Sequence, residues 1–262
     1  MKFLLPLLIL ITAITSSPAQ EKPASAADLA AKLSTGVLDN SSTARLKMDI
    51  IPAPGGEKTV LQLKVNARRT KAASDVHYQV LWPKERKTDS FVLRKPAGQP
   101  AKGETFQPPD AVKSIASAQL QDGIFGSDLA YEDLVDNYFG WENQEITGEE
   151  AVNRVPCIIL LSKPGPGDQS GYTSVKTWID TKRMVPLQIE KYGPGGQIVR
   201  RITITLVAKD DLNRLIPANF AVERPGRNSR TVLEGSNIKH GVKLTDADFS
   251  PEVLRVNPPK PE

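Results

Sequence analysis

The stretch of sequence that decides the fold runs from Gly126 to Val207. It opens with Gly126-Ser-Asp-Leu-Ala-Tyr-Glu-Asp-Leu134, an aromatic and acidic segment. Four runs of alternating apolar and polar residues follow, one of them Tyr172-Thr-Ser-Val-Lys-Thr-Trp-Ile-Asp180. Alternation places one face of a β-strand against a core or a cavity and the other face in water. The stretch therefore predicts a sheet, and it lacks any grouping of His, Cys, Asp or Ser typical of a reaction centre.

The same alternation occurs on both sides of this stretch. It predicts strands at 46–50, 61–67, 76–82 and 91–93, and later at 218–224 and 231–238. The connections are short and carry turn residues, which is typical of hairpins. Residues 96–110, rich in Pro, Gly and Lys, predict an exposed loop. Successive strands with short connections predict one antiparallel sheet of roughly nine to eleven strands.

Two or three helices are expected beside the sheet. Leu29, Leu33 and Val37 recur at four-residue spacing and predict an amphipathic helix at 27–38. Segments 111–120 and 128–138 are the other helical candidates. In the second, Ser127 is a candidate cap, and Asp128, Glu132 and Asp133 are interpreted as charges near a helix start.

The chain begins with Met1-Lys2, followed by an almost wholly apolar run from Phe3 to Ile14. This pattern is typical of a secretory signal peptide, with cleavage after Ala19, and the run is shorter than the roughly 20 apolar residues of a membrane-spanning helix. The prediction is a signal peptide at 1–19, a flexible leader at 20–26, a single domain at 27–255 and a flexible tail at 256–262. The mature protein is expected to be exported and not membrane-spanning.

The net charge limits the classes of partner that we expect, and the single cysteine limits the disulfides. The formal net charge is +4, and loss of Lys2 with the signal peptide leaves +3. The basic residues are interspersed with acidic ones, which argues against nucleic acid as a partner and leaves weak attraction to anionic lipids open. Cys157 lies in an apolar run and is interpreted as a buried hydrophobic residue, so no internal disulfide forms.

Reaction chemistry has little support in the sequence. His77 and His240 are far apart and are interpreted as solvated side chains, and a zinc site would need three or four His or Cys ligands. No nucleophile elbow, phosphate loop or dinucleotide fingerprint is present. We therefore expect no catalytic residue, no metal and no cofactor, and we expect that the protein is not an enzyme.

The aromatic residues permit two interpretations. Trp82, Phe91, Trp141 and Trp178 lie in or beside the alternating runs, and ordinary core packing explains them. The alternative is that a curved sheet with few helices leaves its concave face open to an apolar ligand. The residues predicted to line such a hydrophobic cavity are Val65, Tyr78, Val80, Trp82, Phe91, Leu93, Ile189 and Ile204.

A set of motifs between residues 120 and 255 carries a family resemblance. These motifs are Gly126 to Leu134, Tyr138, Gly148-Glu-Glu150, Val155-Pro-Cys157, Tyr172 to Asp180, Pro186 to Tyr192, Gly195-Gly196, Arg230 to Ile238 and Asp246 to Leu254. Over this range the sequence resembles the outer-membrane lipoprotein-sorting proteins, a LolA-like family of periplasmic lipoprotein carriers. The resemblance implies an α+β fold in which a strongly curved antiparallel sheet forms an incomplete, half-open barrel, with two or three helices covering its mouth. It also implies a periplasmic location and a cavity for the acyl chains of lipoproteins or lipids, with an inner-membrane transporter and an outer-membrane acceptor as partners.

Two functions remain open at this point. The first is a periplasmic lipid or lipoprotein carrier or chaperone, and the second is a non-enzymatic module of the cell envelope that docks a partner protein. An open apolar trough would favour the carrier. A filled core would favour docking through the surface or an exposed strand edge.

Overall fold

A computed structural model describes residues 25–37 and 40–255, which form one antiparallel sheet of 13 strands with a single α-helix among the described residues. The predicted signal peptide, most of the predicted leader and the predicted tail lie outside the described residues. The strands are β1 (Asn40–Ile51), β2 (Thr59–Arg69), β3 (Ala73–Trp82), β4 (Ser90–Pro96), β5 (Lys102–Phe106), β6 (Lys113–Ser114), β7 (Asn143–Val152), β8 (Val155–Lys163), β9 (Ser174–Asp180), β10 (Val185–Tyr192), β11 (Ile198–Lys209), β12 (Leu215–Glu223) and β13 (Arg230–His240).

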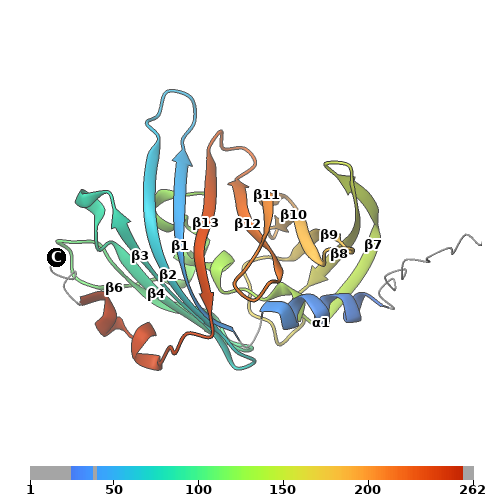
Figure 1. The fold of residues 1–262 in the computed structure, drawn as a ribbon, viewed down its shortest axis with the longest axis horizontal. Helices are drawn as coiled ribbons and strands as arrows, with labels where there is room; N and C mark the ends of the chain where they lie inside the picture. The colour runs from blue at the N-terminus through green and yellow to red at the C-terminus, as the bar shows by residue number, and fades with distance from the viewer. Residues whose placement is uncertain (1–24, 38–39, 256–262) are drawn as a thin grey trace, which may run out of the picture.

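The sheet consists of two meanders joined at their centre. Its order is β6-β5-β4-β3-β2-β1-β13-β12-β11-β10-β9-β8-β7, so β1 pairs with β13 and the sheet is open, with β6 and β7 at its two edges. The chain therefore leaves the sheet at one edge and re-enters it at the other. The connection between β6 and β7 has to cross a face of the sheet, and Figure 1 shows the strands curving around it.

The alternation of the strands explains which side is buried. Across β2, β3 and β4 the register pairs Val65 with Tyr78, and Tyr78 with Phe91. The rings of Tyr78 and Phe91 stack with their centroids 5.1 Å apart. These inward residues belong to one hydrophobic cluster that extends along the sheet to Ile189 and Ile204. The large antiparallel sheet predicted from the sequence is confirmed, with 13 strands in place of the predicted nine to eleven.

The one α-helix, α1 (Ala26–Val37), confirms the helix predicted at 27–38, whose last residue lies outside the described residues. Leu29, Ala30 and Leu33 pack against Phe139 and against apolar residues of β8 and β9. In Figure 1 the helix lies beside the β7–β8 end of the sheet. No helix of the described part is long and apolar enough to span a membrane.

The other two predicted helices are wrong. Segment 111–120 contains β6 and the start of a 3-10 turn, and segment 128–138 contains short 3-10 turns without an α-helix. Local propensity gives way here to long-range contacts, because the acidic residues of the second segment bond to the sheet instead of capping a helix. Just before it, Phe125 and Gly126 have φ of 53° and 89°, a left-handed conformation that a continuous helix does not contain.

The predicted exposed loop at 96–110 is wrong at residues 102–106, where β5 pairs with β4 and β6, whereas residues 97–100 and 107–110 are exposed and lie outside the strands. Its sequence, Lys-Gly-Glu-Thr-Phe, has little strand signal, and the backbone pairing supplies the order. Gly103 is necessary for this pairing, because a Cβ atom there would lie 2.3 Å from the carbonyl oxygen of Val92.

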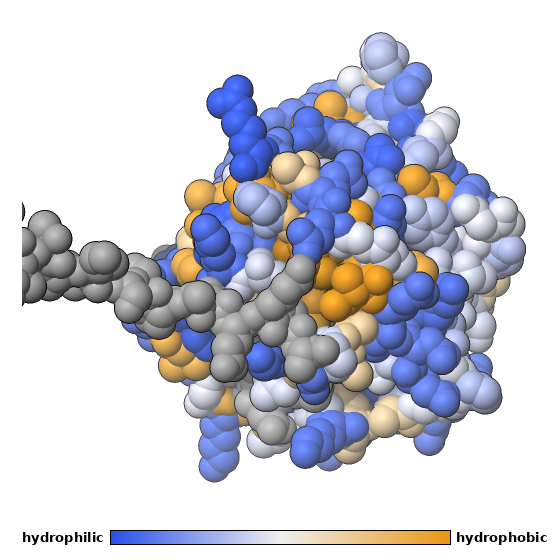
Figure 2. Space-filling model, turned by 90° about the vertical axis from the view of Figure 1, so that its right-hand side faces the viewer, coloured by the Kyte–Doolittle hydropathy of each residue, from blue (hydrophilic) through white to orange (hydrophobic). Residues whose placement is uncertain are grey.

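The part of the surface that faces the viewer in Figure 2 is mostly hydrophilic. On the side shown in Figure 2, hydrophobic residues gather in small groups among hydrophilic ones. Isolated exposed apolar residues are normal in folded proteins. The large hydrophobic residues exposed among the described ones are Ile51, Trp82, Ile146, Leu206, Leu212 and Leu215.

Candidate functional site

The concave face of the sheet is occupied by residues 115–141, which we call the plug segment. The segment contains four 3-10 turns, Ser117–Gln121, Ile124–Gly126, Glu132–Leu134 and Tyr138–Gly140. Its apolar side chains belong to the same core cluster as the inward residues of the strands. The contributing residues of the segment are Ile115, Leu120, Ile124, Phe125, Leu129, Leu134, Val135 and Trp141.

The structure brings seven of the eight predicted cavity residues together beneath this segment. Each of the seven is at most 9% exposed. The eighth, Trp82, lies at the end of β3, is 49% exposed and belongs to no core cluster. A ligand role for these side chains stays a prediction. The seven are Val65, Tyr78, Val80, Phe91, Leu93, Ile189 and Ile204.

Phe91 shows how closely the plug segment fits. Its ring is fully buried, with the ring centroid of Tyr78 at 5.1 Å, that of Phe125 at 5.4 Å and that of Tyr131 at 4.8 Å. Two of these rings come from the plug segment and one from the sheet. The apolar face is therefore filled by the protein's own side chains in this structure.

Asp133 anchors the plug segment to the far half of the sheet. Its carboxylate accepts hydrogen bonds from Lys191 Nζ at 2.8 Å, Arg200 Nε at 2.9 Å and the Tyr172 hydroxyl at 2.6 Å. The side chains of Asp133, Lys191 and Arg200 are all at most 3% exposed. Burial opposes ionisation of Asp133, but the two cations outweigh it and hold the pKa of this carboxyl below its usual value.

Burial and the neighbouring carboxylate act in the opposite direction on Tyr172. Loss of solvent disfavours the phenolate, and the negative charge of Asp133 disfavours it further, so the pKa of Tyr172 lies well above its ordinary value. Tyr172 therefore stays protonated at physiological pH and donates a hydrogen bond to the ionised Asp133. The anchor is a buried cluster of hydrogen-bonded charged groups beside the apolar core.

Two further acidic residues fix the middle of the plug segment. Glu132 accepts hydrogen bonds from the Ser170 hydroxyl at 2.7 Å and from the Gly171 amide at 2.8 Å. Asp136 forms an ion pair with Lys95 and accepts a hydrogen bond from Ser170 at 3.0 Å. These contacts tie the plug segment to β4 and to the connection between β8 and β9.

The acidic motif, Gly126 to Leu134, is also bonded to the sheet and its turns near both of its ends. Asp128 accepts hydrogen bonds from the hydroxyls of Ser229 at 2.6 Å and Thr231 at 2.9 Å. Near the other end, Arg69 Nη2 donates to the carbonyl oxygen of Leu134 at 2.6 Å. The interpretation of Asp128, Glu132 and Asp133 as helix-start charges is therefore wrong, since each of them binds groups elsewhere in the fold.

The strands carried a signal for these anchors. Lys191 follows the inward Ile189 by two residues, and Arg200 precedes the inward Ile202 by two, so both cations take core-facing places in the alternation. Arg69 and Lys95 extend the inward rows of β2 and β4 in the same way. A buried cation needs an acceptor, and residues 133–136 supply one to each: Asp133 to Lys191 and Arg200, Asp136 to Lys95 and the Leu134 carbonyl to Arg69.

A cavity of about 260 Å³ opens beside the last turns of the plug segment. Val135 and Trp141 of the segment line it, together with Ser34 of α1 and the ion-paired Lys95 and Asp136.

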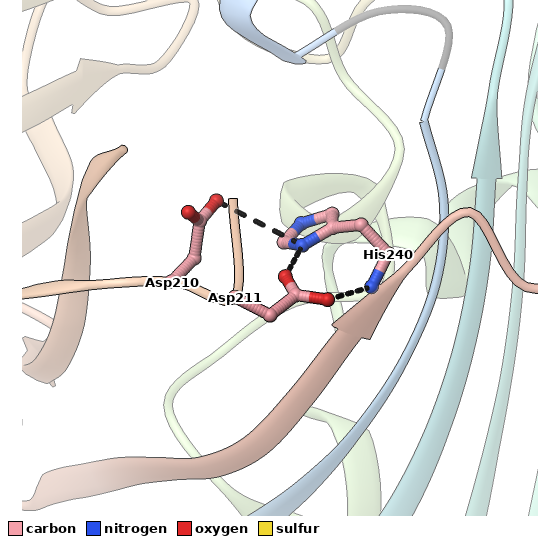
Figure 3. A group of neighbouring side chains, drawn as sticks. All are labelled: Asp210, Asp211 and His240. Carbon is pink, nitrogen blue, oxygen red and sulfur yellow. Dashed lines mark hydrogen bonds and ion pairs between the residues drawn. The ribbon is translucent and has the colours of Figure 1, made fainter. Parts of the chain in front are cut away.

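Both histidines are less solvated than predicted. His77 is 8% exposed; burial and the charge of Lys64 lower its pKa to about 4. His240 lies at the end of β13, where its backbone amide donates to Asp211 at 2.8 Å and its ring contacts the same carboxylate (Figure 3). The side chain of His240 is 7% exposed.

Asp210, Asp211 and His240 bring three ligand-type atoms within 4.8 Å of one another. Asp210 Oδ2 lies 3.8 Å from His240 Nδ1, but it also accepts a hydrogen bond from Arg214 Nε at 2.8 Å. A guanidinium therefore already neutralises Asp210. The group joins the β11–β12 turn to the end of β13, as Figure 3 shows, and its geometry is that of a structural ion-pair cluster.

Cys157 is buried, as predicted. Burial raises the pKa of its thiol, so little thiolate forms at neutral pH.

Comparison with known proteins supports the fold. A family model described as "Uncharacterized protein" matches residues 109–256, more than half of the chain. No curated protein matches the sequence. Among solved structures, a DUF1329 family protein from Desulfovibrio piger has a TM-score of 0.78 at 21% identity, covering 87% of this chain and 97% of the other.

Two further structures have the same fold. A domain from Vibrio parahaemolyticus, described as an outer membrane lipoprotein-sorting protein, gives a TM-score of 0.76 at 19% identity and covers 87% of this chain and 97% of its own. A LolA superfamily protein from Nitrosomonas europaea gives 0.69 at 16% identity, with 87% and 99% covered. At these identities the likeness establishes a LolA-like fold.

Proposed function

The chain belongs to the family of uncharacterized proteins whose model matches residues 109–256 and has a LolA-like fold, and from this we propose that it is a periplasmic carrier of acyl chains. The cargo is a lipoprotein or a lipid, held on the concave face of the sheet after the plug segment moves away. An inner-membrane transporter and an outer-membrane acceptor are the partners that such a carrier requires.

The observation that supports this proposal most is the composition of the concave face. Seven inward apolar side chains from both meanders share one cluster, and polar contacts such as Lys191 to Asp133 and Arg69 to the Leu134 carbonyl hold the plug segment over them. An acyl chain needs a continuous apolar surface and no converging polar groups, and each CH₂ removed from water gains about 0.8 kcal/mol.

Displacing the plug segment by cargo exchanges one apolar cover for another. Side chains such as Phe125 and Leu129 leave the face, and acyl CH₂ groups take their places. The hydrophobic free energy lost when the plug segment leaves is offset by that gained when the acyl chain binds. Breaking the polar contacts of Asp133, Asp136 and Asp128 therefore sets most of the free energy needed for opening. The plug segment consists of short 3-10 turns and their connections and contributes no strand to the sheet, so its residues beyond Ile115 can move without breaking the pairing of the 13 strands.

The test is native mass spectrometry of the mature protein purified from a bacterial periplasm, followed by organic extraction. We expect a bound phospholipid or acylated protein, and a larger loaded fraction for Asp133→Asn, which loosens the plug segment. Asp49→Asn is the matched control, because Asp49 is 8% exposed and is paired with Lys47 at 3.2 Å and Lys58 at 2.6 Å, away from the plug segment. An unloaded mass for all three proteins, unchanged by added fatty acid, would contradict the carrier.

The filled concave face favours a second candidate, a non-enzymatic docking module. In that case β7 (Asn143–Val152) is the surface to consider, because it is an edge strand with mostly exposed side chains. An extended segment of a partner can add to such an edge through backbone hydrogen bonds. The unloaded result described above, together with a partner chain crosslinked to β7, would support this function in place of the carrier.

A further inference from the structure

A second cavity, of about 350 Å³, lies at the end of the sheet where two hairpin turns approach the plug segment. One turn joins β10 to β11 and the other joins β12 to β13. The cavity is distinct from the apolar concave face, because three guanidinium groups line it. They belong to Arg200, Arg224 and Arg227.

These three arginines are not equally neutralised. Arg200 is paired with Asp133, which it shares with Lys191. Arg224 donates from Nη2 to the carbonyl oxygen of Gln121 at 3.0 Å, and its Nε is buried without a hydrogen-bond partner. Within the part of the chain that the structure describes, neither Arg224 nor Arg227 forms an ion pair with a carboxylate.

The positive groups repel one another across the cavity. Burial, followed by the charges of Arg200 and Arg227, lowers the pKa of Arg224 from its usual value. The charges of Asp128 and Asp133 act in the opposite direction on Arg224, but neither carboxylate forms an ion pair with it: Asp128 accepts hydrogen bonds from Ser229 and Thr231, and Asp133 is paired with Lys191 and Arg200. A buried donor without a partner and an excess of positive charge in one cavity are both satisfied by a bound anion.

We propose that this cavity binds a phosphate ester, with Arg224 and Arg227 as its ligands and Arg200 at its inner wall. The planar guanidinium donates two parallel hydrogen bonds to adjacent oxygens, a geometry that matches phosphate. The volume exceeds that of a bare phosphate ion and is in the range of sites that hold small organic ligands. A soluble phosphate ester and the head group of an anionic phospholipid share this chemistry.

The site adjoins an attachment point of the plug segment. The carbonyl oxygen of Gln121 accepts hydrogen bonds from both Arg200 and Arg224. An anion in the cavity therefore competes with this carbonyl for the guanidinium of Arg224. The anion site itself does not depend on the acyl-carrier proposal, because its two proposed ligands, Arg224 and Arg227, belong to the turn between β12 and β13.

The test is isothermal titration of the mature protein with glycerol 3-phosphate at constant ionic strength, with sodium chloride as the reference. We expect saturable binding, weakened at least about tenfold in Arg227→Gln and Arg224→Gln, the scale of one charge-assisted hydrogen bond. Arg227 is exposed, so its replacement leaves the core intact. Arg45→Gln is the control, since Arg45 is an exposed arginine on β1.

Vesicle sedimentation then distinguishes the two sources of phosphate. Binding to phosphatidylcholine vesicles that contain phosphatidylglycerol, lost in Arg227→Gln, assigns the site to a lipid head group. Binding of glycerol 3-phosphate without vesicle binding assigns it to a soluble ester. The proposal is overturned if neither probe binds more strongly than chloride, or if Arg227→Gln and Arg224→Gln bind as Arg45→Gln does.

Discussion

Replacing Asp133 by Asn tests how the plug segment is held. The change keeps the size of the side chain and one acceptor oxygen but removes the charge that neutralises Lys191 and Arg200. Both cations are at most 3% exposed, so water cannot replace the lost carboxylate. The Tyr172 hydroxyl, at 2.6 Å, also loses a charged acceptor.

The expected cost follows from this burial. Removing one partner of a buried ion pair costs about 3–5 kcal/mol, because an uncompensated charge remains inside the protein. Two cations share Asp133, and the remaining Asn oxygen satisfies one of them in part. We expect the free energy of unfolding to fall by about 3–5 kcal/mol, a large share of the roughly 5–15 kcal/mol that stabilises a domain.

Urea unfolding, followed by tryptophan fluorescence, measures this loss, with Asp49→Asn as the control. The folded pKa of Asp133 lies below its unfolded value, so its stabilisation is complete at neutral pH. The difference between wild type and variant should shrink as the pH falls below about 3.9 and through the lower folded pKa. A loss below about 1 kcal/mol at pH 7, equal to that of Asp49→Asn, would refute the anchoring role of this buried cluster.

Other changes probe separate parts of the fold. The pKa of His77 is about 4 in the fold against 6.5 ordinarily, so the free energy of unfolding should fall by about 1–2 kcal/mol between pH 7 and pH 5 in urea titrations. His77→Phe should remove that loss, and a loss that persists in the variant would contradict its assignment to His77. Phe91→Ala should cost about 3–5 kcal/mol in unfolding free energy, whereas Trp82→Ala should cost less than about 1 kcal/mol; similar costs would contradict the burial of Phe91. Cys157 should react with a thiol reagent only in urea, and fast labelling of the folded protein would show that its strand opens.

The sheet was predictable because its information is local. Period-two alternation marks β1 to β4 and β7 to β13, and short turns between them indicate antiparallel pairing. β5 carries almost no such signal, since Lys102 to Phe106 gains its order from pairing with β4. The membership of Val65, Tyr78 and Phe91 in one core also follows from alternation.

The plug segment was not predictable from its own residues. Its acidic and apolar residues fit a helix locally, but their partners lie far along the chain: Lys191 is 58 and Arg200 is 67 residues from Asp133. Only the pairing of these distant inward cations with the acidic motif indicates a buried anchor. The exposed position of Trp82 likewise depends on where β3 ends, a boundary that alternation does not define.

Hydrogen–deuterium exchange with and without a neutral acyl ligand, such as a monoacylglycerol, tests the central claim most directly. If cargo takes the place of the plug segment, the amides of residues 115–141 should exchange faster in the loaded protein while those of β2, β3, β10 and β11 stay protected. Unchanged protection of residues 115–141 in a protein shown to be loaded would mean that the acyl chain binds elsewhere and that the plug segment is a permanent part of the core.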